Sequence, residues 1–142
     1  MKLATLRTGF GTSAIRIDGD NVGVELDYED VGQLLRSEDW RKAAQLSGEP
    51  VVFDHADLEA VVPTPGKVIC VGLNYAKHIR EMGRDFPEHP TLFIKFADAL
   101  TGPYDDVFIP EYGTQKLDYE GELAVIIGAV SYTHLTLPTK RI

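Results

Sequence analysis

Residues 65–78 read PGKVICVGLNYAKH, in which an apolar run is followed by a glycine and then by a polar segment. The run from Lys67 to Val71 is rich in β-forming residues and predicts a buried strand. Asn74 is a suitable N-cap and Gly83 a suitable residue beyond the C-cap, so a short helix is expected from Tyr75 to Met82. The stretch therefore predicts a strand, a tight turn and a helix that carries His78 near its middle.

The expected helix places two polar side chains on one face. His78 and Glu81 are three residues apart, which makes them neighbours on a helix surface. A glutamate beside an imidazole can fix its tautomer and raise its basicity, as a general base that activates water requires. The alternative is a surface histidine in a helix held by ion pairs among Lys77, Arg80 and Glu81.

A second informative stretch is residues 117–123, LDYEGEL, at the start of an apolar run. We expect one strand from Leu117 to Ile127. Side chains alternate across a strand, so Asp118, Glu120 and Glu122 would share a face. Either water screens these carboxylates, in an ordinary solvated face, or a hard cation such as Mg²⁺, Mn²⁺ or Ca²⁺ neutralises them.

One lysine lies within another apolar run. The segment Thr91 to Phe96 predicts a strand, and Lys95 within it must reach solvent or find an anion. It could bind a substrate carboxylate, and simple exposure on the strand is an equal alternative. The lone cysteine, Cys70, is expected to be a small core residue, and the other histidines show no metal-ligand spacing with it.

Composition limits the classes of function. The chain has 142 residues, 44% hydrophobic and 25% charged, and a formal net charge of −8. Such a balance is typical of a soluble globular protein, and its acidity argues against nucleic-acid and membrane-surface partners. With one cysteine, no apolar leader and no stretch long enough for a bilayer, the expected location is cytoplasmic.

The first sixty residues predict a small α+β unit. Ser13 to Ile17 and Val22 to Leu26 flank a turn-forming segment, which is a hairpin pattern. Helices are expected over Glu29 to Arg36 and again after Ser37, as its cap, with Trp40, Ala43, Ala44 and Leu46 as apolar positions. The segment PTPG at 63–66 interrupts regular structure, so we predict a domain over residues 1–62 and another over 66–130, with a further short strand at Val107 to Ile109.

The last twelve residues, 131–142, differ in composition. They hold no acidic residue and carry a charge of +2, whereas residues 1–130 carry −10. We interpret this tail as a foreign ending that follows a truncated reading frame. A divergent native C-terminus is the alternative.

Taken together, in order and spacing, these segments resemble the fumarylacetoacetate hydrolase family. The matching pieces are PGKVICVGLNYAKH at 65–78, EMG at 81–83, PTLFIK at 90–95, Gly102-Pro103, Ile109-Pro110 and LDYEGEL at 117–123. The resemblance is strong over about residues 63–130. The first sixty residues resemble more weakly the small N-terminal domain of bacterial members.

The resemblance implies a β-rich α+β fold: a small N-terminal α+β domain followed by the truncated start of a mixed β-roll. It also implies one divalent cation, Mg²⁺ or Mn²⁺, and a homodimer when the protein is full length. By the same analogy Glu120 and Glu122 are metal ligands, His78 is the base, and Glu81 orients it. The third carboxylate ligand and a later substrate lysine of the family would lie beyond the end of this chain.

The implied substrate is a small keto acid, and the expected reaction is hydrolysis of a carbon–carbon bond in an acylpyruvate. Decarboxylation of oxaloacetate and isomerisation of an unsaturated keto acid are alternatives, because all three reactions pass through an enolate. Two further alternatives remain: an inactive fragment that lacks the third ligand, and a small acidic binding module without chemistry.

Overall fold

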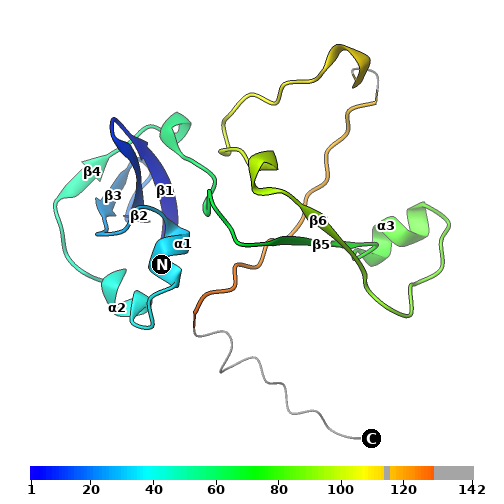
Figure 1. The fold of residues 1–142 in the computed structure, drawn as a ribbon, viewed down its shortest axis with the longest axis horizontal. Helices are drawn as coiled ribbons and strands as arrows, with labels where there is room; N and C mark the ends of the chain where they lie inside the picture. Colours follow the sequence, from blue (N-terminus) through cyan, green and yellow to red (C-terminus); the bar gives the residue numbers. More distant parts are fainter. Residues whose placement is uncertain (114–115, 130–142) are drawn as a thin grey trace, which may run out of the picture.

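The structure is a computed structural model that describes residues 1–113 and 116–129. Its elements form two groups (Figure 1): a four-stranded sheet with short helices near the N-terminus, and a two-stranded sheet with one helix further along the chain. This is the mixed α+β class that the sequence predicts. The domain boundary expected at residues 63–66 stays a prediction, and the tail at 131–142 lies outside the described residues.

The N-terminal sheet is an antiparallel meander in the order β1-β2-β3-β4. Its strands are β1 (Lys2–Thr8), β2 (Gly11–Ile17), β3 (Val22–Glu25) and β4 (Pro50–Val52). The expected hairpin is confirmed as β2 and β3, joined through the turn at 18–21. The outer strands β1 and β4 were not predicted. Both depend on pairing with this hairpin, which a local pattern does not reveal.

Two small apolar clusters hold this unit together. One combines Ala14, Val31 and Leu34 with Trp40 packed against it, and the other combines Leu6, Ile15, Phe53 and their neighbours. Helix α1 (Val31–Leu35) covers the first cluster, and its N-cap Asp30 accepts a hydrogen bond from the backbone N–H of Gln33.

Helix α2 (Trp40–Ala43) differs from its prediction. Its N-cap is Asp39, not Ser37, and the Asp39 side chain makes no capping hydrogen bond. Ala44 is fully buried as expected, whereas Leu46 is 65% exposed. The helix is only four residues long, so Leu46 lies beyond its end and does not face the core.

The second group contains β5 (Val68–Gly72), α3 (Ala76–Glu81) and β6 (Thr91–Lys95). Strands β5 and β6 pair antiparallel, with Cys70 opposite Phe93. All three elements lie where the sequence predicts them, within one or two residues. Tyr75, not Asn74, occupies the N-cap of α3, and its side chain makes no capping hydrogen bond.

The C-terminal end of α3 follows its prediction closely. Gly83 has a φ of 66°, and the N–H of Arg84 donates to the carbonyl of Ile79 across 3.1 Å. This left-handed glycine and the long return bond are the usual way to satisfy the last carbonyls of a helix. Ile79 is the buried residue of the helix, at 2% exposure.

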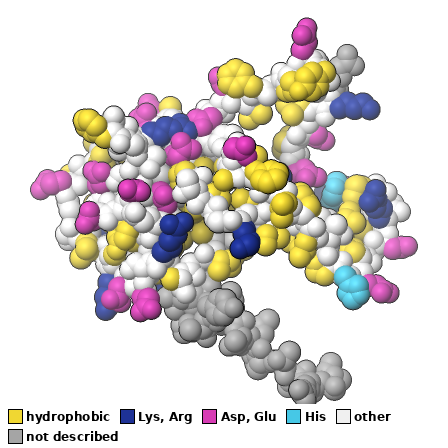
Figure 2. Space-filling model, in the orientation of Figure 1, with side chains coloured by type: hydrophobic (Ala, Val, Ile, Leu, Met, Phe, Trp, Pro, Cys, Tyr) yellow, Lys and Arg dark blue, Asp and Glu magenta, His cyan; other side chains and the backbone are white. Residues whose placement is uncertain are grey.

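The sheet formed by β5 and β6 is less buried than predicted. All five residues of β6 are exposed, and Ile69 of β5 is 57% exposed. Figure 2 shows hydrophobic side chains gathered over this part of the molecule. A two-stranded sheet covers few of its own side chains, so an apolar sequence alone does not guarantee burial.

Two strands predicted near the C-terminal end are wrong. Residues 107–109 and 117–127 form no strand, and most of their side chains are exposed. The segment 117–127 instead runs as irregular chain past β5 and β6 (Figure 1). A strand needs a neighbouring backbone for its N–H and C=O groups, and none pairs with this segment in the described part of the chain.

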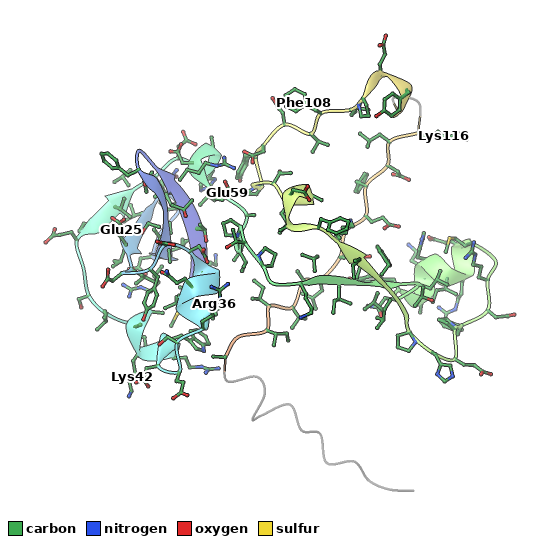
Figure 3. All side chains as sticks on the ribbon, in the orientation of Figure 1. Glu25, Arg36, Lys42, Glu59, Phe108 and Lys116 are labelled. Atoms are coloured by element: carbon green, nitrogen blue, oxygen red, sulfur yellow. The ribbon has the colours of Figure 1, made fainter. Side chains whose placement is uncertain are left out.

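The turn after β6 docks on the N-terminal sheet. Arg7 of β1 forms a forked pair with Asp105 and donates through Nε to Glu59 across 2.7 Å. The N–H of Gly102 also donates to Asp105, across 2.7 Å. Figure 3 labels Glu59 at this junction. We call Arg7, Glu59, Gly102 and Asp105 the clasp.

Charge pairing in the clasp shifts its ionisation. Hydrogen bonds from Arg7 hold the pKa of Asp105 and that of Glu59 below their ordinary values. The same two carboxylates raise the pKa of Arg7, Asp105 more strongly. The clasp therefore stays charged at neutral pH and joins residues that are far apart in the sequence.

Candidate functional site

The candidate site lies where residues 117–123 pass helix α3. The turn that follows β5 brings the chain to this helix, and Leu73 in that turn adopts a φ of 54°. Such a conformation is uncommon for a residue with a side chain and is found most often in turns and at functional sites. It lets the chain leave the strand sharply, so that α3 lies beside the end of β5.

The structure brings together two of the residues proposed from the sequence. His78 Nε2 lies 3.9 Å from Glu120 Oε1, although the two residues are far apart in the sequence. That separation is too long for a direct hydrogen bond but suits one bridging water or a small rotation of either side chain. Their side chains are 50% and 73% exposed, so water and a small solute can reach both.

A second contact fixes the same segment. The backbone N–H of Leu123 donates to the Tyr75 hydroxyl across 2.9 Å. Sequence reasoning gave Tyr75 no role, although it precedes His78 by one helical turn in the GLNYAKH motif. A tyrosine at a helix start can reach a neighbouring segment with its hydroxyl, and this was the available signal.

Glu81 is placed differently from its prediction as a partner of His78. Its Oε1 lies 3.7 Å from the Lys77 ammonium, one turn earlier on α3. This is the ion-paired helix surface that was the alternative interpretation. The side chains of Lys77 and Glu81 are 90% and 60% exposed, so the pair contributes little to stability. The orienting role of Glu81 stays a prediction.

Lys95 and Glu122 are exposed, and over residues 1–113 and 116–129 the structure records no ion pair for either side chain. Lys95 ends β6, where it lies opposite Val68. Glu122 follows Glu120 by two residues, but the chain there is not a strand, so the shared face predicted from β alternation has no support. Both roles remain predictions.

The residues offer part of a metal site. Within the described ranges, no group of three or more His, Cys, Asp or Glu side chains lies close enough to hold an ion. Magnesium, however, is commonly held by one or two carboxylates, with water and substrate as the other ligands. The carboxylates of Glu120 and Glu122 fit such an ion in chemistry, but they do not form an all-protein cage.

A hollow of about 360 Å³ lies beside α3, between the end of β5 and the loop at 86–90. Ile79 and Asn74 line it, together with Phe86 and His89. Neither His78 nor Glu120 lines this hollow. No helix in the described part of the chain is long and apolar enough to cross a bilayer.

Comparison with known proteins gives a consistent result. A family model described as fumarylacetoacetate hydrolase C-terminal matches residues 67–138. The chain is 51% identical over 69 residues to oxaloacetate tautomerase FAHD2A, mitochondrial, of Bos taurus, covering 49% of this chain and 22% of that protein. It is 51% identical over 74 residues to oxaloacetate tautomerase YisK of Bacillus subtilis, covering 50% of this chain and 25% of that protein.

A solved structure is also similar. A crystal structure from Mycobacterium smegmatis, described as an HpcE protein, superposes with a TM-score of 0.59 and 28% identity, over 78% of this chain and 41% of that one. The chain thus spans about a quarter of the length of these two curated relatives. The matched region includes α3 and the segment 117–123, which together form the candidate site.

Proposed function

Because the chain belongs to the fumarylacetoacetate hydrolase family, whose model matches residues 67–138, we propose that its site moves a proton within a small keto acid. Tautomerisation of an oxaloacetate-like acid is the reaction we favour. The approach of His78 to Glu120, 3.9 Å apart within the matched region, carries the proposal. The names of both tautomerase relatives support this choice of substrate class.

The reaction requires a base, and it leaves the atomic composition of the substrate unchanged. His78 Nε2 takes a proton from the carbon beside the keto group, and the proton is returned to the keto oxygen, which yields the enol; the reverse sequence restores the keto form. Glu120 stabilises the positive charge that the ring gains when it takes the proton. Both side chains are exposed, so a small acid can approach the imidazole from the solvent side.

A Mg²⁺ or Mn²⁺ ion at Glu120 and Glu122 would add Lewis-acid polarisation of the substrate oxygens. This cofactor, the homodimer and the cytoplasmic location remain proposals, and one relative's name carries the word mitochondrial. Hydrolysis of an acylpyruvate carbon–carbon bond, the reaction expected from the sequence, also stays untested. The relatives' names favour the isomerase alternative over it.

The test follows the loss of enol absorbance of oxaloacetate, with Mg²⁺ present, for the 142-residue chain. We expect His78→Ala to lower the rate about 10²-fold or more, the usual contribution of a general base. His89→Ala is the control, because it removes another exposed imidazole from the loop after α3. An undiminished rate in His78→Ala would refute the role of the base. A wild-type chain without activity would favour the inactive-fragment alternative.

A further inference from the structure

The irregular segment that carries the carboxylates has few anchors. Among the described residues, the stretch 116–127 makes two polar contacts to other parts of the chain, and the Ala129 N–H beyond it donates to the Leu35 carbonyl. The two contacts are the Leu123 N–H to the Tyr75 hydroxyl, and Glu120 to His78. Leu123 is 83% exposed and Ile127 65%, so apolar packing does little to hold the segment in place. Its register against α3 therefore depends on these contacts.

The two contacts show that helix α3 and the carboxylate segment run in opposite directions. From Tyr75 to His78 the helix advances three residues, and from Leu123 back to Glu120 the segment does the same. Three residues span about 4.5 Å in a helix but about 10 Å in an extended chain. The long phenol side chain at the helix start makes up the difference. A shorter side chain at position 75 could not reach from the start of the helix to the Leu123 amide.

We propose that Tyr75 is a positioning residue that sets the register of residues 117–123, so that Glu120 faces His78. This inference rests on the proposed function. The register of this segment decides which of its residues lies opposite the His78 ring. A slip at Leu123 would therefore replace Glu120 with Tyr119 or Gly121 opposite the imidazole.

A single hydrogen bond can matter here because the described residues of the segment have few other anchors, which are Glu120 beside His78 and, at the far end, the Ala129 N–H that donates to the Leu35 carbonyl across 2.9 Å. Tyr75 itself is 43% exposed, so water can take the place of the Leu123 amide as the partner of its hydroxyl. The bond therefore biases the segment toward one register without locking it. Loss of the hydroxyl should loosen residues 117–123 and leave helix α3 intact, because the buried contacts of Ile79 hold the helix.

The first experiment needs no activity. Amide hydrogen exchange at Leu123 is measured by NMR in the wild-type chain, in Tyr75→Phe and in Tyr119→Phe. The control removes the hydroxyl of Tyr119, a residue that is 90% exposed, and the structure records no hydrogen bond to that hydroxyl from the described residues. We expect Leu123 to exchange about two- to tenfold faster in Tyr75→Phe, the range for one net hydrogen bond. It should be unchanged in Tyr119→Phe.

The second experiment links the bond to the site. Tyr75→Phe should lower kcat for the proposed tautomerisation more than it changes KM. The penalty of Glu120→Gln should shrink in the Tyr75→Phe background, because the carboxylate no longer faces the ring there. Leu123→Pro, which removes the donor instead of the acceptor, should reproduce the Tyr75→Phe effect without adding to it.

The outcomes separate the two ideas. Unchanged Leu123 exchange in Tyr75→Phe would overturn the positioning role even if His78 proves essential. Faster exchange with unaltered kcat in an active enzyme would also overturn it, since the bond would then hold the segment without serving the site. Faster exchange in a chain that shows no tautomerisation would confirm the anchor and refute the proposed function.

Discussion

Replacing Gly102 with alanine should disrupt the clasp between the two groups of elements. A Cβ at this position would lie 2.4 Å from the Leu58 carbonyl oxygen, 2.8 Å from Arg7 Nη2 and 3.0 Å from an Asp105 carboxylate oxygen. The nearest contact is backbone, which cannot rotate away. A contact of this kind needs about 3.2 Å or more, so the turn must move by nearly 1 Å, and overpacking on that scale costs about 1–3 kcal/mol.

The assay is urea unfolding followed by fluorescence. The only tryptophan, Trp40, packs against the N-terminal core, so its emission reports the unit on which the turn docks. We expect Gly102→Ala to lower the unfolding midpoint. Gly66→Ala is the matched control, because nothing lies within 4 Å of its added Cβ. That control should be neutral or slightly stabilising, because alanine restricts the unfolded chain.

One result would refute the close packing, and another would refute a contribution from the ion pair. If Gly102→Ala were as stable as Gly66→Ala, the turn would not be packed against Leu58 as the structure has it. If Gly102→Ala lost stability but Asp105→Asn did not, the close packing would be real while the forked ion pair with Arg7 would contribute nothing.

Three further predictions concern the N-terminal unit and the clasp. The pKa of Asp105 is lowered in the folded chain, so its contribution to the free energy of unfolding is complete above the ordinary aspartate pKa and is lost as pH falls through the lowered value. Asp105→Asn should therefore make stability depend less on pH below about pH 4, as measured by urea unfolding. Thr5→Val should cost about 1–3 kcal/mol by the same measurement, because the fully buried Thr5 hydroxyl bridges the Val31 amide and the Val61 carbonyl, and Thr5→Ser should restore most of the loss. Leu34→Ala should cost about 2–5 kcal/mol by thermal or urea unfolding, since Leu34 is fully buried in the first cluster, and a loss below 1 kcal/mol would contradict that packing.

Local patterns predicted the local elements well. The β2–β3 hairpin, the strand β5 and the helix α3 with Gly83 at its end all follow from residues adjacent in sequence. These features depend on turn chemistry and capping, which a short stretch of sequence contains. The family resemblance added the order of the pieces, and the match over residues 67–138 confirms it.

Features that depend on distant partners were not predicted. The segment 117–127, expected to be a strand, pairs with no backbone among the residues that the structure describes, and β1 was missed because its partner strand supplies its hydrogen bonds. The approach of His78 to Glu120 was expected only by analogy. The Tyr75 contact and the clasp join residues tens of positions apart, so no periodicity in the sequence reveals them.

Our central proposal is that α3 and residues 117–123 form one site, in which the His78 imidazole lies beside carboxylates able to bind a cation. Titration of the labelled chain with Mn²⁺, followed by paramagnetic broadening in NMR spectra, tests this claim directly. We expect the resonances of Glu120, Glu122 and the His78 ring to broaden first, and the effect to disappear in Glu120→Gln. Broadening that begins instead at the acidic hollow lined by Glu25 and Glu29, with the His78 ring unaffected, would contradict the claim.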